Sequence, residues 1–136
     1  MGRNRNYRKG IKAEYRLKRA LEEQDWVVVR SAGSHGFWDL VAFRFKPGFV
    51  DILLLQVKAS EPPAKTMQVV INRGRFRALE AVVYVQGRAV FLSRRRQLSL
   101  SDPFRAFRPA KGVVQVFSSD PPEEPPKPDR QGDRSG

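Results

Sequence analysis

Apolar positions near the start of the chain recur with a helical period inside a strongly basic stretch. A helix capped near residue 6 and ending near residue 24 would place Gly10, Glu14, Leu17 and Leu21 along one face. The charged residues between these positions would then lie on the outward side, where they are easily solvated. The pattern predicts an amphipathic helix whose buried stripe carries one acid, Glu14.

Beyond residue 25 the apolar segments become short and are bounded by turn residues, which is typical of β-strands. The predicted strands are 26–30, 38–45, 49–59, 81–86, 89–93 and 112–117. Lys46-Pro47-Gly48 would join the second and third into a hairpin, and Gly87-Arg88 the fourth and fifth. The third strand is apolar on both faces, which favours a central position in the sheet. Residues 68–80 are ambiguous between strand and short helix, and Ser101 begins a helical turn.

The composition divides the 136 residues into a basic N-terminal arm, a single folded domain and a C-terminal tail. Residues 1–9 carry four bases and no acid, so we expect a flexible basic arm whose Arg3, Arg5, Arg8 and Lys9 contact phosphates. Residues 10–119 form the folded domain. Residues 120–136 contain five prolines and no apolar anchor, which predicts a disordered tail.

Charge points to a polyanionic partner, because the net charge is +12 and the sequence pI is near 10.9. The same balance would also fit a merely soluble chain from a GC-rich or hot-living source. The absence of Cys and the single His exclude a disulfide framework, a Cys/His zinc site and a thiol nucleophile. No apolar run approaches a membrane span and no secretory signal is visible, so we expect a cytoplasmic protein without a membrane partner.

Candidate chemistry lies in the first hairpin. A turn centred between Pro47 and Gly48 pairs residues whose numbers sum to 95, which places Asp39 opposite Gln56 and directs Lys58 to the same face. A register that differs by one residue would instead oppose Asp39 to Leu55. Taken singly, each of these residues has a duller explanation as a turn cap or a solvated strand end.

Packing of the helix on this sheet would bring Glu14 to the same place, so that two carboxylates, one amide and one ammonium converge. Hard oxygen donors from separate elements favour Mg²⁺, for which Mn²⁺ would be able to substitute. Such an ion activates a water molecule and polarises a phosphate, while Lys58 assists deprotonation or neutralises developing charge. The predicted chemistry is therefore phosphodiester hydrolysis.

Five short stretches resemble the archaeal-type Holliday-junction resolvases called Hjc, in the PD-(D/E)xK nuclease superfamily. They are YRKG at Tyr7–Gly10, AE at Ala13-Glu14, VVRSAGS at Val28–Ser34, DLVA at Asp39–Ala42 and VK at Val57-Lys58. The likeness is good over residues 7–60 and weak from there to about residue 118. It implies an α/β fold with a mixed central sheet flanked by helices and a restriction-endonuclease-like core, so that residues 10–119 would be a nuclease domain.

The resemblance also implies a homodimer that binds four-way DNA junctions and nicks two opposing strands symmetrically. Glu14, Asp39 and Gln56 would be metal ligands, with Val57 adding a backbone carbonyl and Lys58 the catalytic amine. Arg30 would contact phosphate, and Ser31 and Ser34 would approach the cleaved strand. The predicted catalytic residues are Glu14, Asp39, Gln56, Lys58 and Ser34, and His35 is left out of this set.

The chain departs from the family pattern at Gln56, where a Glu is usual, and at Tyr15, where an Arg is usual. The segment around residues 43–50 is also longer. Two other functions therefore stay open: a repair or flap endonuclease of the same superfamily, and a branched-DNA-binding protein without catalysis. Apolar segments at residues 82–85 and 90–92 would supply a dimer interface or would simply be core.

Overall fold

The fold, in a computed structural model, is described for residues 2–31, 38–108 and 110–119, with the side chains from residue 8 onward. A single helix, α1 (Gly2–Glu23), precedes the strands of the described part. The strands are β1 (Val27–Arg30), β2 (Leu40–Lys46), β3 (Phe49–Lys58), β4 (Met67–Arg73), β5 (Phe76–Gln86), β6 (Ala89–Ser93), β7 (Arg96–Gln97) and β8 (Val113–Ser118). The first elements of the sequence thus lie close to their predicted positions.

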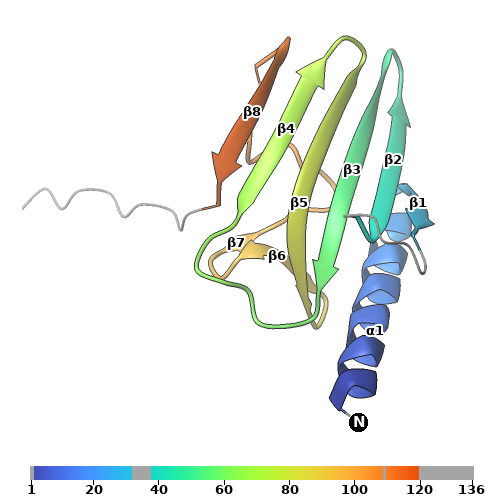
Figure 1. Ribbon diagram of the computed structural model, residues 1–136. Helices are drawn as coiled ribbons and strands as arrows, with labels where there is room; N and C mark the ends of the chain where they lie inside the picture. Colours follow the sequence, from blue (N-terminus) through green and yellow to red (C-terminus); the bar gives the residue numbers. More distant parts are fainter. Residues whose placement is uncertain (1, 32–37, 109, 120–136) are drawn as a thin grey trace, which may run out of the picture.

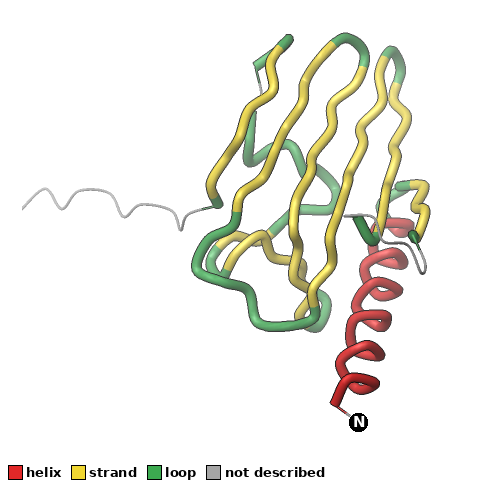
Figure 2. Tube along the Cα trace, viewed as in Figure 1, coloured by secondary structure: helices red, strands yellow, loops and turns green. Residues whose placement is uncertain are grey.

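The strands form one mixed sheet in the order β1-β2-β3-β5-β4-β8, and β6 pairs with the end of β5 and with β7. The β3–β5 pair is parallel, whereas the other pairs are antiparallel. Figure 2 shows that strand β4 and loops, rather than a helix, connect β3 to β5. The prediction of a mixed central sheet in an α/β chain is confirmed.

One face of the sheet holds the core. Leu17 and Leu21 of α1 are fully buried, as their helical spacing predicts, and pack in the same apolar cluster as Leu55 of β3 and Val83 of β5. Leu98, Phe104 and Phe107 belong to that cluster too. Helix α1 and the segment that follows β6 therefore cover the same face.

The opposite face is mostly apolar, with Gln56 and Glu80 among its polar side chains, and no described helix packs on it (Figure 1). Phe45 is 74% exposed there, Val114 63% and Val116 61%. The expectation of helices flanking the sheet is therefore met on one face alone within the described residues. The ambiguous segment 68–80 belongs to the β4–β5 hairpin, and the turn after Ser101 does not become a helix.

Several smaller expectations have clear outcomes. Helix α1 begins at Gly2, so residues 2–9, which we expected to form a separate arm, are its first turns. Hairpin β5–β6 turns at Gly87-Arg88 as predicted. Val83, Val85, Val90 and Leu92 are buried in the core rather than offered to a partner. The tail 120–136 lies outside the described residues. Within the described part, no helix has the length and apolar character needed to cross a membrane.

Candidate functional site

Asp39 lies where the β2–β3 ladder changes register. The predicted pairing holds from Leu40 opposite Leu55 to Lys46 opposite Phe49. The Asp39 N–H then donates to the carbonyl of the same Leu55 at 2.8 Å, so Asp39 is displaced by one residue and does not continue the ladder opposite Gln56. The carboxylate Oδ2 of Asp39 accepts the Val57 N–H at 2.8 Å, which fixes it against the β3 backbone.

Glu14 meets Arg30 beneath the edge of the sheet. Arg30 ends β1 and faces α1, and its Nε donates to Glu14 Oε1 at 2.9 Å. The two side chains are only 15% and 18% exposed, Glu14 being the more buried. The Arg30 guanidinium also lies 4.7 Å from the ring centre of Tyr15. Tyr15 thus helps to hold Arg30 in place by a cation–π contact.

Glu14 and Asp39 influence each other electrostatically. Burial raises the pKa of Glu14 above its ordinary value of 4.5, and the nearby Asp39 charge raises it further. The ion pair and hydrogen bond with Arg30 act in the opposite direction but do not cancel these effects. The pair of carboxylates is therefore under-neutralised, and a bound cation would relieve it.

Gln56 projects to the other face of the sheet, since its neighbours Leu55 and Val57 are both buried in the core. Its side chain lines a cavity of about 170 Å³ together with Trp38, Met67 and Glu80. Trp38 Nε1 donates to Glu80 Oε2 at 3.0 Å across this cavity. Lys58, two residues further along β3, is exposed and alternates to the same face as Gln56, so the structure does not bring it together with Glu14 and Asp39.

The structure thus brings together Glu14, Arg30, Asp39 and the backbone of Val57, which come from four separate segments. It does not place the Gln56 side chain with them. Sequence reasoning missed Trp38, Glu80 and Tyr15. Glu80 could have been found from the sequence. If residues 68–80 are read as strands, Glu80 lies on the same face of the sheet as Gln56.

Some of the remaining predicted residues are described by the structure, and the others are not. Ser31 donates its N–H to the Asp39 carbonyl at 2.9 Å, and Arg8 and Lys9 are exposed on α1. Ser34 and His35, like the side chains of Arg3 and Arg5, lie outside the described residues.

The donor set suits a hard divalent cation in part. Glu14 and Asp39 provide carboxylate oxygens, and the strained charge balance between them favours a cation. Among the described residues, no group of three or more His, Cys, Asp and Glu side chains is arranged to hold a metal ion. A site here would therefore rest on two carboxylates, backbone oxygen such as the Val57 carbonyl, water and substrate.

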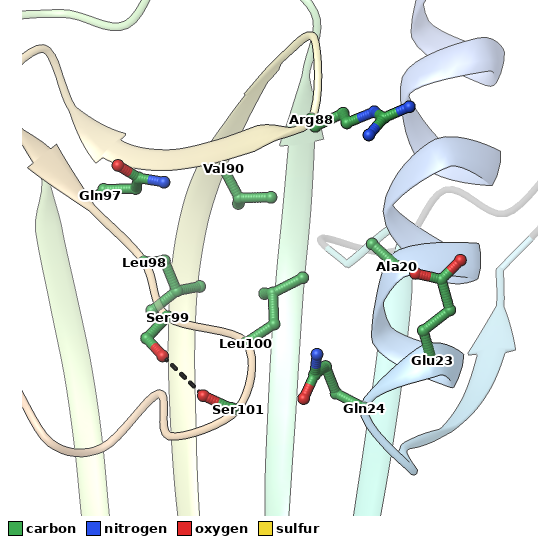
Figure 3. Close-up of a pocket in the computed structure, with 10 residues that line it drawn as sticks. All are labelled: Ala20, Glu23, Gln24, Arg88, Val90, Gln97, Leu98, Ser99, Leu100 and Ser101. Atoms are coloured by element: carbon green, nitrogen blue, oxygen red, sulfur yellow. Dashed lines mark hydrogen bonds between the residues drawn. The ribbon is translucent and has the colours of Figure 1, made fainter.

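A larger hollow lies elsewhere. It has a volume of about 480 Å³, lies between the end of α1 and the β6–β7 segment, and is lined by Glu23, Arg88 and the 97–101 segment among others (Figure 3). None of the predicted site residues lines it. We assign it no function.

Comparison with known proteins gives one match. A family model described as archaeal Holliday junction resolvase (Hjc) matches residues 5–97. Searches of curated proteins and of solved structures found no significant match. The family match spans α1 to β7 and contains Glu14, Arg30, Asp39, Gln56 and Lys58. Because it covers well over half of the sequence and includes the residues that converge, this chain belongs to the archaeal Holliday junction resolvase family.

Proposed function

We propose that this chain is a structure-selective endonuclease that resolves four-way DNA junctions by metal-dependent, symmetric nicking of two opposing strands. Its family implies a nuclease that acts on branched DNA in recombination. The observation that carries the proposal is the meeting of Glu14, Arg30 and Asp39, from a helix and two strand ends, in one partly buried place. An acidic site in a chain of net charge +12 suits a cation and a DNA phosphate together.

The proposed ligands of the divalent cation are Glu14, Asp39 and the Val57 carbonyl. Mg²⁺ is the expected ion, with Mn²⁺ as a substitute, and when bound it would polarise the scissile phosphate and activate a water molecule. Arg30 orients Glu14 through its 2.9 Å hydrogen bond, and the Val57 N–H orients Asp39. To contribute its amide oxygen, Gln56 would have to turn out of the cavity that it shares with Glu80.

Proposed DNA contacts surround this place. To neutralise charge that develops on the phosphate, Lys58 would have to reach the site from the other face at the end of β3. Arg30, Ser31 and Ser34 would contact the DNA backbone near the cleaved strand. Arg8 and Lys9, which are exposed on α1, are further proposed phosphate contacts, and the sequence adds Arg3 and Arg5 as candidates. A protein with this function works with the DNA inside the cell.

The partner we propose besides DNA is a second copy of the chain. A four-way junction has approximate two-fold symmetry, and two coordinated nicks need two sites. The apolar sheet face opposite α1 suits such an isologous contact, because large uncovered apolar patches are rare on monomers.

Cleavage of synthetic DNA with Mg²⁺ tests the proposed function. We expect paired nicks in opposing strands of a four-way junction and none in a linear duplex of the same sequence. Cutting of flaps at the same rate would favour a repair endonuclease instead. Tight junction binding without any cleavage would favour a non-catalytic binding protein, the alternative that the placement of Gln56 supports.

A further inference from the structure

Three turns form one end of the sheet, far along the strands from the candidate site (Figure 1). They are Pro47-Gly48 between β2 and β3, Gly74-Arg75 between β4 and β5, and Lys111-Gly112 before β8. The Val50 N–H donates to the Arg75 carbonyl at 2.9 Å, and the Gly112 N–H to the Asn72 carbonyl at 2.6 Å. These bonds join the three turns, called here the turn end, into one continuous surface.

The turn end is strongly basic. Segments 44–51, 72–77 and 108–113 contain seven Lys and Arg residues and a single acid, Asp51. Asp51 is completely buried, and Arg77 binds it with two hydrogen bonds of 2.9 and 3.0 Å. Lys46 lies 3.4 Å and Arg44 3.9 Å from the same carboxylate. Three cations thus share one buried charge, and these segments offer no exposed acid to offset them.

Aromatic rings hold several of these cations in place. The Arg77 guanidinium lies 4.5 Å from the ring centre of Phe104 and 5.3 Å from that of Phe49. Lys46 lies 5.5 Å from the centre of Phe49. Side chains that are already ordered lose less entropy when they bind a ligand, so the turn end is prepared for an anion.

A hollow of about 390 Å³ opens between the three turns and is lined by Gly48, Phe49, Asn72, Gly74, Phe76, Arg77 and Lys111. Gly48 and Gly74 have φ of 86° and 61°, and a Cβ added at either would meet nothing within 4 Å, so the backbone there is open to close approach. Phe49 and Phe76 are 36% and 37% exposed as whole residues. Basic side chains that lie beside exposed aromatic rings and accessible glycine backbone are typical of surfaces that bind nucleic acids.

We propose that the turn end binds the DNA phosphodiester backbone at a second place, on an arm of the junction away from the cleaved phosphate. This inference rests on the proposed function for the identity of the polyanion. Val57, whose backbone belongs to the candidate site, lies eight positions along β3 from Phe49, so the two places are about 26 Å apart along the strand. That distance corresponds to roughly eight base pairs of duplex.

The separation makes the proposal testable with arm length. The probes are two four-way junctions, one with arms of roughly 20 base pairs and one with arms of roughly five, which end before the turn end is reached. The test variant is Arg73→Ala/Arg75→Ala/Lys111→Ala. The control Arg88→Ala/Arg94→Ala/Arg95→Ala also removes three exposed charges, from turns that begin and end β6.

We expect the test variant to lose about tenfold or more of its affinity for the long-arm junction and to reduce the salt slope by about 2 to 3. Its affinity for the short-arm junction should equal that of the wild type, and the control should show no dependence on arm length. Equal affinities of wild type and test variant for the long arms would overturn the proposal. So would the same loss on short arms.

Failure of the proposed function gives a different result. A wild-type protein that neither prefers the junction nor nicks it would refute resolvase activity. The contribution of the turn end would still be measurable on plain duplexes of roughly 20 and five base pairs. Loss of affinity on the long duplex alone supports the second contact, and no loss on either overturns it.

Discussion

At the scale of single residues, burial and the Asp39 charge disfavour the ionised form of Glu14, whereas Arg30 favours it. Its pKa is raised above 4.5 because burial and Asp39 both disfavour the charged form, against the favourable contact with Arg30. The folded protein therefore binds this proton more tightly than the unfolded chain does. Stability from this group is highest below pH 4.5 and is lost as the pH rises through the raised pKa.

Glu14→Gln should show this directly. Relative to wild type, the variant should be more stable at pH 7 than at pH 4, so its free energy of unfolding should be relatively larger at pH 7. The reason is that the glutamine never carries the buried charge. Urea unfolding at the two pH values measures the difference. A variant that becomes relatively worse as the pH rises would show that the Arg30 ion pair outweighs burial.

For Asp39, we expect the negative charge, rather than the shape of the side chain, to be needed for nicking. Asp39→Asn keeps an oxygen that accepts the Val57 N–H, so the thermal midpoint should stay near that of wild type. Junction nicking should fall by at least about 100-fold, because a ligand charge is lost at the proposed cation, while junction affinity changes little. Asp102→Asn, at an exposed position, is the matched control. Wild-type nicking by Asp39→Asn would refute the assigned site.

At the scale of elements, buried Asp51 ties three strands together. It lies on β3, and its cationic partners lie on β2 and β5, so its charge helps to hold the strands in register. Asp51→Asn leaves these cations without an anion and should reduce the free energy of unfolding by about 2–3 kcal/mol.

Chemical denaturation measures this loss, and Asp25→Asn, at an exposed position after α1, serves as the control. An unchanged stability would mean that solvent already neutralises the cluster. The same variant should leave the exposed Arg73, Arg75 and Lys111 of the turn end in place.

At the scale of the whole molecule, the sheet has one covered and one open face. Val114 and Val116 of β8 are 63% and 61% exposed on the open face, whereas Val113 alternates to the other side and is 42% exposed. If two copies associate through the open face, Val116→Glu should convert the dimer to a monomer because it buries an unpaired charge in the contact.

Light scattering coupled to gel filtration measures the mass of each variant. Val113→Glu, on the same strand but the opposite face, should remain dimeric. A dimer that survives Val116→Glu unchanged would place the interface elsewhere.

Much of the fold was predictable because its signals are local. The Pro47-Gly48 turn sets the register of β2 against β3, and that register holds over the whole ladder from Leu40 to Lys46. The helical spacing of Leu17 and Leu21 correctly identified the buried face of α1. The segment 68–80 stayed ambiguous because its choice of strand depends on pairing with β3 and β8, which are remote in sequence.

The proximity of Glu14, Arg30 and Asp39 could be expected from the sequence, whereas the placement of Gln56 could not. The sequence by itself determined that Glu14, Arg30 and Asp39 are available on elements that pack together, since motif spacing and helical period are properties of the chain. Only the tertiary structure decided that Asp39 is offset by one residue against β3 while Gln56 lies on the opposite face beside Glu80. A one-residue offset at a strand end costs little locally, and the contacts that select it come from distant segments, so no local pattern records it.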